Sequence, residues 1–248
     1  MTEIHFFYIE YCIQNTKPNH VQRNTGRNMA KLGDEYENLD QKVYQVIKTM
    51  IEDRTLLPGH KIPQEKLAAE LGISRTPLIS ALKFLEHEKL VEVKPRRGFF
   101  VRLFTIQEMI SIFEIREVLE GLAARRAAQC ITDEECNALR DIFKVFEKDS
   151  DILDILAYSR ADRKFHTMIT HLASREFLTT MLQTFNIISL TYQNVTREGL
   201  IQDPNITLQD HIDIIEAICS RNSERAESLM REHFRKAIEQ LKLKIKEK

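Results

Sequence analysis

Glycine and proline divide this 248-residue chain into two segments with different folding constraints. Four of the six prolines and three of the seven glycines fall between Tyr36 and Leu103. Beyond Leu103 only Gly121, Gly199 and Pro204 remain. Because both residue types interrupt regular structure, the first segment must consist of short elements joined by tight turns, whereas the second can form long helices.

The second segment has the apolar periodicity of amphipathic helices. From Thr105 onward, apolar residues recur at three- and four-residue spacing in six blocks, and Thr105 and Thr132 stand where N-caps are expected, the latter with Glu135 three residues later. The blocks cover residues 106–130, 133–148, 151–172, 174–197, 206–219 and 222–246. We therefore expect an all-α six-helix bundle over residues 104–248.

The first segment has the element order of a winged helix-turn-helix. An apolar stripe from Leu39 to Ile51 predicts one helix, and a second is expected over residues 64–71. Ser74 can cap a third helix that begins at Arg75. Residues 90–94 and 99–102 have the composition of two strands around a turn. The fold class expected is mainly α, with this domain over residues 36–103 and a poorly ordered extension over residues 1–35.

Polar and basic residues lie where a winged helix meets double-stranded DNA. A recognition helix needs short polar side chains and arginine at its N-terminal end, and a wing needs cations at its tip. Those positions are held by Ser74, Arg75, Thr76, Arg96, Arg97 and Gly98. Between residues 75 and 102, seven basic residues face three acidic ones, although the whole chain has a net charge of −1. A solvated cationic face is the alternative, but the position on a helix-turn-helix favours DNA.

Cysteine spacing and hydropathy argue against several other classes. The four cysteines form no C-x-x-C pair, which disfavours a disulfide framework or a zinc ribbon and favours a reducing cytoplasm. No run approaches the roughly 20 apolar residues of a spanning helix, so we expect no membrane location.

Three stretches of the first segment resemble the DNA-binding signature of the GntR family. They are residues 57–62, 67–78 and 97–101, and together they span nearly fifty residues. The resemblance implies that Arg75, Thr76 and the wing at Gly98 contact operator DNA. One departure is Ile79, where the family usually has arginine. Isoleucine cannot hydrogen-bond guanine or phosphate, so we expect the operator to differ from the family's common one.

The helical half resembles the FadR C-terminal (FCD) subgroup of the same family. The marks of the resemblance are Ile115-Arg116 with Leu119-Glu120, Asp162 to His166, His211 with Ile215 to Ile218, and Met230 to His233. It implies a homodimer, with a divalent metal and a small carboxylate metabolite inside the bundle. Because one recognition helix reads only a few base pairs, we expect the homodimer to bind an imperfect palindrome. A metabolite-responsive repressor or activator is therefore implied, with repression preferred.

Arg116 is the candidate anchor for the effector carboxylate, because a guanidinium can hold both carboxylate oxygens at once. The alternative is an i, i+4 ion pair with Glu120 on an exposed helix face. The sequence leaves these two roles equally open.

Asp162, His166, His211 and His233 form the candidate metal site. Asp162 and His166 are four residues apart, so both project from one face of one helix. His211 and His233 lie among apolar residues on two later helices, and buried histidines are costly unless paired or ligating. Spacing and resemblance together favour a metal, and this donor set suits zinc, nickel, manganese or iron.

A metal-dependent enzyme is the competing class, because these four residues could leave a coordination position open for chemistry. The sequence has no His-Glu-x-x-His element, glycine-rich phosphate loop or nucleophile motif. A protein-binding adaptor is a third class, and the arginine-bearing wing argues against it.

Overall fold

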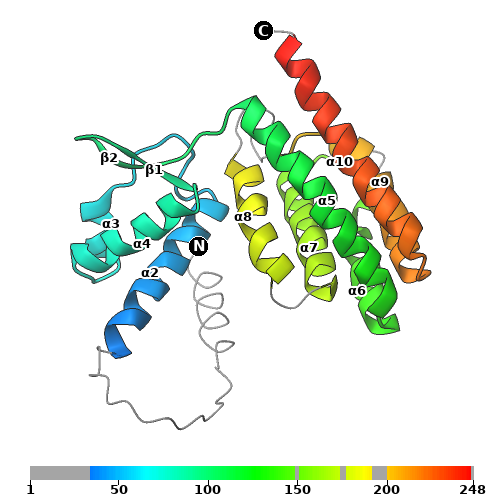
Figure 1. Ribbon diagram of the computed structural model, residues 1–248, viewed down its shortest axis with the longest axis horizontal. Helices are drawn as coiled ribbons and strands as arrows, with labels where there is room; N and C mark the ends of the chain where they lie inside the picture. Colours follow the sequence, from blue (N-terminus) through cyan, green and yellow to red (C-terminus); the bar gives the residue numbers. More distant parts are fainter. Residues whose placement is uncertain (1–33, 149–150, 174–176, 192–199, 247–248) are drawn as a thin grey trace. The chain divides into compact units, whose positions relative to one another are not determined.

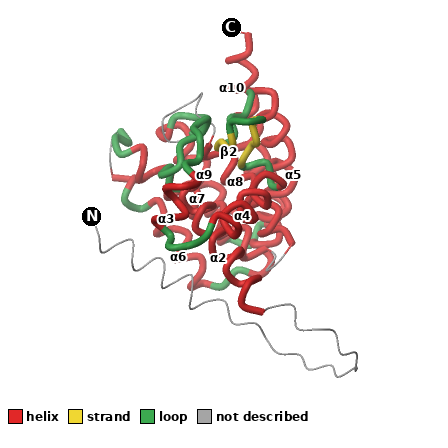
Figure 2. Tube along the Cα trace, turned by 90° about the vertical axis from the view of Figure 1, so that its left-hand side faces the viewer, coloured by secondary structure: helices red, strands yellow, loops and turns green. Residues whose placement is uncertain are grey.

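The computed structural model describes residues 34–148, 151–173, 177–191 and 200–246 (Figure 1). The expected extension lies outside these ranges except for Asp34 and Glu35, which already belong to a helix. The end of the block expected over residues 174–197 also lies outside them. Helices dominate the described residues, which contain a single pair of strands (Figure 2).

The first described segment is a winged helix-turn-helix. Three helices precede a β-hairpin in which Val91 pairs with Val101 and Lys94 with Gly98. The elements are α2 (Asp34–Glu52), α3 (Gln64–Glu70), α4 (Arg75–His87), β1 (Val91–Lys94) and β2 (Gly98–Val101). The predicted order of three helices and a hairpin is confirmed.

The core of this segment comes from the apolar stripes of α2 and α4. Ile47 and Ile51 of α2, and Leu78, Leu82 and Leu85 of α4, are fully buried. Burial of such side chains contributes roughly 1.5–3 kcal/mol each. The stripe seen in the sequence is therefore the face that holds the helices together.

A polar network fixes the C-terminal end of α4 to α2. The Tyr44 hydroxyl donates to Glu88 at 2.5 Å, and Lys48 Nζ lies 2.6 Å from the Tyr44 oxygen and 3.1 Å from Glu88. Burial, followed by the hydrogen bond to Glu88, raises the pKa of Tyr44, so the phenol stays protonated and donates. Glu88 is the residue directly after α4, so the network holds that end of the helix.

The expected cap of α4 is not formed. Ser74 occupies the N-cap position, but its side chain makes no capping hydrogen bond. An N-cap hydroxyl accepts from the N–H of the second or third helical residue. Pro77 is that third residue and has no N–H, so one of the two donors is missing.

The second segment contains six α-helices in the described residues, as predicted. They are α5 (Ile106–Cys130), α6 (Asp133–Phe143), α7 (Ile155–Ala173), α8 (Phe177–Thr191), α9 (Pro204–Cys219) and α10 (Ser223–Lys246), with a short 3₁₀ helix, η1 (Phe146–Lys148), after α6. The antiparallel pair α5 and α10 packs side by side, and α7 packs on α5 as well (Figure 1). None of the described helices has the length and apolar character needed to cross a membrane.

Two helices of the bundle begin with capping boxes, of which the sequence predicts the one at Thr132 with Glu135 and only the N-cap residue Thr105 of the other. Thr132 Oγ1 accepts from the Glu135 N–H at 3.2 Å, and the Glu135 carboxylate accepts from the Thr132 N–H at 2.9 Å. Thr105 and Glu108 form the same reciprocal pair at the start of α5. Each box satisfies backbone donors that the first helical turn leaves unpaired.

Replacing Thr132 with alanine should lower the free energy of unfolding by about 1 kcal/mol, because the cap of α6 is lost. The matched control is Thr132→Ser, which keeps the hydroxyl and should stay close to wild type. Urea titrations followed by far-UV circular dichroism measure both. Equal midpoints for the alanine and serine variants would show that this cap does not stabilise the protein.

Candidate functional site

The N-terminal end of α4 is exposed and carries one loosely held arginine. Ser74, Arg75 and Thr76 are all solvent-exposed. Arg75 Nη2 lies 3.3 Å from Glu65 Oε1 of α3, in a pair whose side chains are 62% and 82% exposed. Exposed ion pairs contribute little free energy, so Arg75 can exchange Glu65 for a phosphate or a base edge at small cost.

The wing turn places an arginine in a backbone conformation that favours glycine. The Arg97 N–H donates to the Lys94 carbonyl at 2.9 Å, which closes a tight turn. Within it Arg96 has φ 61° and the next glycine, Gly98, has φ 95°. Left-handed backbone costs a non-glycine residue roughly 1–2 kcal/mol. Arg96 therefore occupies the tip at the expense of folding stability.

The other wing arginine is held over an aromatic ring. The Arg97 guanidinium lies 5.6 Å from the ring centroid of Phe100 in β2, and Lys94 Nζ lies 4.6 Å from the same centroid. Cation–π contacts of this kind contribute about 0.5–1 kcal/mol at exposed sites. Both Arg96 and Arg97 are exposed at the tip of the wing. Of the two arginines, Arg97 is the one that contacts the Phe100 ring.

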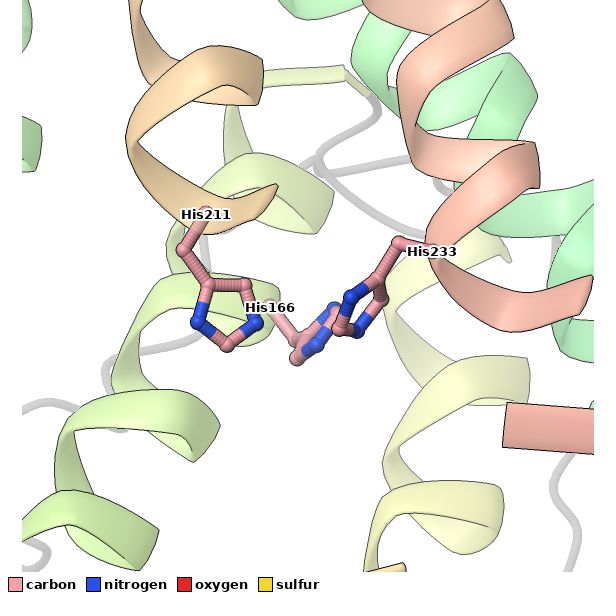
Figure 3. Close-up of side chains that lie close together, drawn as sticks. All are labelled: His166, His211 and His233. Atoms are coloured by element: carbon pink, nitrogen blue, oxygen red, sulfur yellow. The ribbon is translucent and has the colours of Figure 1, made fainter. Parts of the chain in front are cut away.

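The candidate metal ligands converge inside the bundle. His166 of α7, His211 of α9 and His233 of α10 face one another (Figure 3), and one ring nitrogen from each lies within 4.8 Å of the others. All three are buried. Asp162, one turn before His166, places Oδ1 3.8 Å from His166 Nε2 and 3.3 Å from His211 Nε2. The four residues singled out in the sequence are therefore brought together.

A chain of hydrogen bonds orients the His211 ring. Its Nδ1 lies 3.0 Å from the Tyr158 oxygen, which lies 2.8 Å from Thr207 Oγ1. Thr207 in turn donates to the Pro204 carbonyl at 3.4 Å. The Pro204 carbonyl can only accept, so Thr207 donates to it and accepts from the Tyr158 hydroxyl. Tyr158 in turn accepts from His211, whose proton is therefore on Nδ1. The His211 Nε2 lone pair then faces Asp162, and this buried atom has no hydrogen-bond partner among the described residues.

The other two histidines also have acidic neighbours. His166 Nδ1 hydrogen-bonds the Glu120 carboxylate of α5. His233 Nδ1 lies 3.7 Å from Asp210 Oδ2, too far for a direct hydrogen bond, while Lys236 Nζ donates to Asp210 at 2.8 Å. Metal-bound histidines commonly have such carboxylate or hydroxyl partners on the second ring nitrogen. Neither Glu120 nor Tyr158 was predicted in this role from the sequence.

Burial sets the ionisation of the cluster. It lowers the pKa of His211 well below its usual range, and the neighbouring histidines lower it further. Burial also lowers the pKa of His233, against an opposing effect of Asp210. Burial alone would raise the pKa of Glu120. The charges and hydrogen bonds of Arg116 and His166 outweigh this effect and lower the pKa to about 2. His211 and His233 are therefore neutral imidazoles, the form that binds metal, near the ionised carboxylate of Glu120.

Arg116 is buried and bound to the same carboxylate. Its Nε and Nη2 each lie 2.7 Å from Glu120 Oε1, and Nη1 donates to Ser189 of α8 at 2.9 Å. Arg116 is 5% exposed and Glu120 1% exposed. The i, i+4 pair considered from the sequence therefore forms, but in the interior and not on an exposed face.

A small cavity adjoins both the cluster and Arg116. Its volume is about 30 Å³, and its lining includes Arg116, Asp162, Arg163, His166, Asn186 and Ser189. The space is enough for roughly two water molecules. Asn186 Oδ1 is buried without a hydrogen-bond partner among the described residues. A larger hollow of about 520 Å³, between α6 and α9, is lined by none of the four candidate ligands.

Two family models match the two segments. Residues 39–101 match the model described as bacterial regulatory proteins, gntR family, and residues 111–236 match the FCD domain.

The relatives found by sequence are described as transcription regulators. The chain is 28% identical over 211 residues to the uncharacterized HTH-type transcriptional regulator YdhC of Bacillus subtilis. The aligned region covers 82% of this chain and 91% of that protein. It is 22% identical over 206 residues to the HTH-type transcriptional repressor RspR of Escherichia coli, with 82% and 89% covered.

A solved structure shares the fold. The structure of E. coli McbR/YncC aligns with a TM-score of 0.67 at 21% identity, over 84% of this chain and 98% of that one. The likeness supports the mainly helical fold with its small hairpin.

The strained wing residue gives a prediction that separates folding from binding. Arg96→Gly should leave the free energy of unfolding unchanged or raise it by up to about 1 kcal/mol, because glycine relieves the left-handed backbone. The same change should weaken duplex DNA binding and reduce its salt dependence by the loss of one cation. Urea unfolding and fluorescence anisotropy at several salt concentrations measure the two effects. A variant that binds DNA with wild-type affinity and salt dependence would remove Arg96 from the interface.

Proposed function

This chain belongs to the gntR family of bacterial regulatory proteins, in the group that carries an FCD domain, and we propose that it is a metabolite-controlled regulator of transcription. As a family member with relatives named as HTH-type regulators, it is a DNA-binding regulator. The proposal adds three features: repression of an operator through α4 and the wing, a divalent metal within the helical bundle, and a small carboxylate that controls DNA affinity.

The metal proposal rests on one observation, the unpartnered Nε2 of His211 within a cluster of buried histidines. A buried imidazole nitrogen without a partner is costly, and coordination of a cation removes that cost. Asp162, His166, His211 and His233 would hold the ion. Nitrogen and carboxylate donors suit zinc, nickel, manganese or iron. The bound ion would offer a coordination position for an effector oxygen.

The effector proposal rests on Arg116 and the adjoining cavity. Arg116 gives Nε and Nη2 to Glu120, but each of its NH₂ groups carries a second N–H that a ligand carboxylate can use. The cavity of about 30 Å³ is too small for an organic acid. A carboxylate ligand must therefore widen the cavity. Asp162 of α7 and Ser189 of α8 line it, so movement of either helix would enlarge it. A ligand that fits only the widened form has unequal affinity for two conformations, which is the condition for control of DNA binding.

Two copies of the chain are part of the proposal, because one recognition helix reads only a few base pairs. Two-fold symmetry doubles those contacts and matches an imperfect palindrome.

The competing proposal is a metal-dependent enzyme that uses the same four residues. An enzyme of this kind needs a general base beside the metal. Glu120 is the nearest buried carboxylate to His166, but Arg116 and His166 bind both of its oxygens and keep its pKa low. Such a group positions its neighbours and is a poor base, which favours the regulator.

Arg75→Ala should weaken binding of the full-length protein to its operator by about 1–3 kcal/mol, if Arg75 contacts a base. The probe is a duplex that the wild-type protein selects from a random-sequence library, titrated by fluorescence anisotropy. The matched control, Lys144→Ala, removes one exposed positive charge from the helical domain and should leave affinity close to wild type. Equal affinity of Arg75→Ala and wild type would reject the base contact.

Protein purified without an affinity tag should contain about one divalent ion per chain by elemental analysis. His211→Ala and His233→Ala should lose it, because each removes a ligand. His171→Ala, an exposed histidine on α7, should keep it. Glu120→Gln should bind the ion about 10–100-fold more weakly, since it loses the ionised partner of His166. Wild-type protein that can be loaded with none of zinc, nickel, manganese or iron would contradict the site.

A further inference from the structure

The stripe of α4 directly opposite its buried face carries polar side chains with one exception, and the exposed Phe84 lies outside this stripe, toward the buried Pro77. Five residues spaced by helical turns lie opposite the buried face of the helix. They are Thr76, Ile79, Ser80, Lys83 and His87. Thr76, Lys83 and His87 are exposed, whereas Ile79 and Ser80 are partly buried. Ile79 is the apolar member of this outer stripe.

Ile79 does not belong to the core that holds α4 in place. The buried residues of α4 are Pro77, Leu78, Ala81, Leu82 and Leu85, which lie on the other face. Ile79 is partly buried, so part of its side chain stays in water in the free protein. That part can become buried only against something that meets the outer face of α4.

The major groove offers one apolar group to such a side chain. Base edges there present hydrogen-bond donors and acceptors, apart from the C5 methyl group of thymine. Ile79 can make no side-chain hydrogen bond but can pack on that methyl group. Ile79 lies about one helical turn after Arg75, a rise of about 6 Å along α4, so the two side chains can reach neighbouring positions of one groove.

We infer that Ile79 reads the C5 methyl group of a thymine in each operator half-site, near the base contacted by Arg75. The inference rests on the proposed binding of DNA through α4. It identifies Ile79 as a specificity residue, and the thymine as a required feature of the sequence that this protein recognises.

The test replaces thymine by uracil, which removes only the methyl group and keeps the base pair. A duplex selected by the wild-type protein from a random library is resynthesised with uracil at each thymine in turn. At one position per half-site, uracil should weaken binding of the full-length wild-type protein about fourfold, the effect of one buried methyl group. Ile79→Ala should bind the thymine and uracil duplexes equally well.

Two further variants make the result specific. Ile79→Val keeps a branched apolar side chain and should retain the preference for thymine. Ile79→Arg should shift the preference at the same position to guanine, which a guanidinium can contact bidentately. Thermal unfolding should give all variants a melting temperature close to that of wild type, since Ile79 lies outside the core.

The outcomes separate this inference from the proposed function. If each uracil substitution changes the affinity of wild type and Ile79→Ala by the same factor, Ile79 reads no methyl group, although the protein still binds DNA. A large loss of stability in Ile79→Ala and Ile79→Val would likewise assign Ile79 to folding and overturn the inference. A wild-type protein that selects no duplex at all would contradict DNA binding through α4 itself.

Discussion

The interior of the helical domain depends on the pairing of the buried Glu120 carboxylate with Arg116 and His166. A charge taken out of water costs several kcal/mol unless partners of opposite charge surround it, and Glu120 is only 1% exposed. Arg116 binds one of its oxygens and His166 the other. Through these bonds and the contact from Arg116 to Ser189, one carboxylate joins α5, α7 and α8. The orientation of a proposed metal ligand and of a proposed effector anchor is therefore fixed by the same group.

Local features of the fold could be predicted from the sequence because their causes lie within a few residues. The capping box at Thr132 needs only a threonine and a glutamate three residues apart, and it is present. The cap expected from Ser74 is absent, and a local cause contributes, since Pro77 removes one of the two N–H donors that such a cap can use. The pairing of Arg116 with Glu120 followed from helical spacing. Its burial did not, because burial is decided by α7 and α8, which lie at least thirty residues away in the sequence.

The candidate metal site likewise has one part that local spacing predicts and one part that depends on how distant helices pack. Asp162 and His166 share a helix face, so the spacing alone brings them together. His211 and His233 lie on other helices, and their apolar neighbours together with the resemblance to a known domain predicted that they would meet His166 in the interior. Tyr158, which orients His211, could not be identified because an aromatic residue on an apolar helix face usually marks a core position.

The hydrogen bonds among Tyr44, Lys48 and Glu88 fix the C-terminal end of α4 and not its N-terminal end. Glu88 holds the C-terminal end against α2, and the 13 residues of α4 extend about 20 Å from there to Arg75. A rotation of about 5° around that end would move Arg75 by about 1.7 Å, roughly half the rise of one base pair. If α4 binds DNA as proposed, the bonds at Glu88 would therefore determine how accurately Arg75 is positioned against the bases.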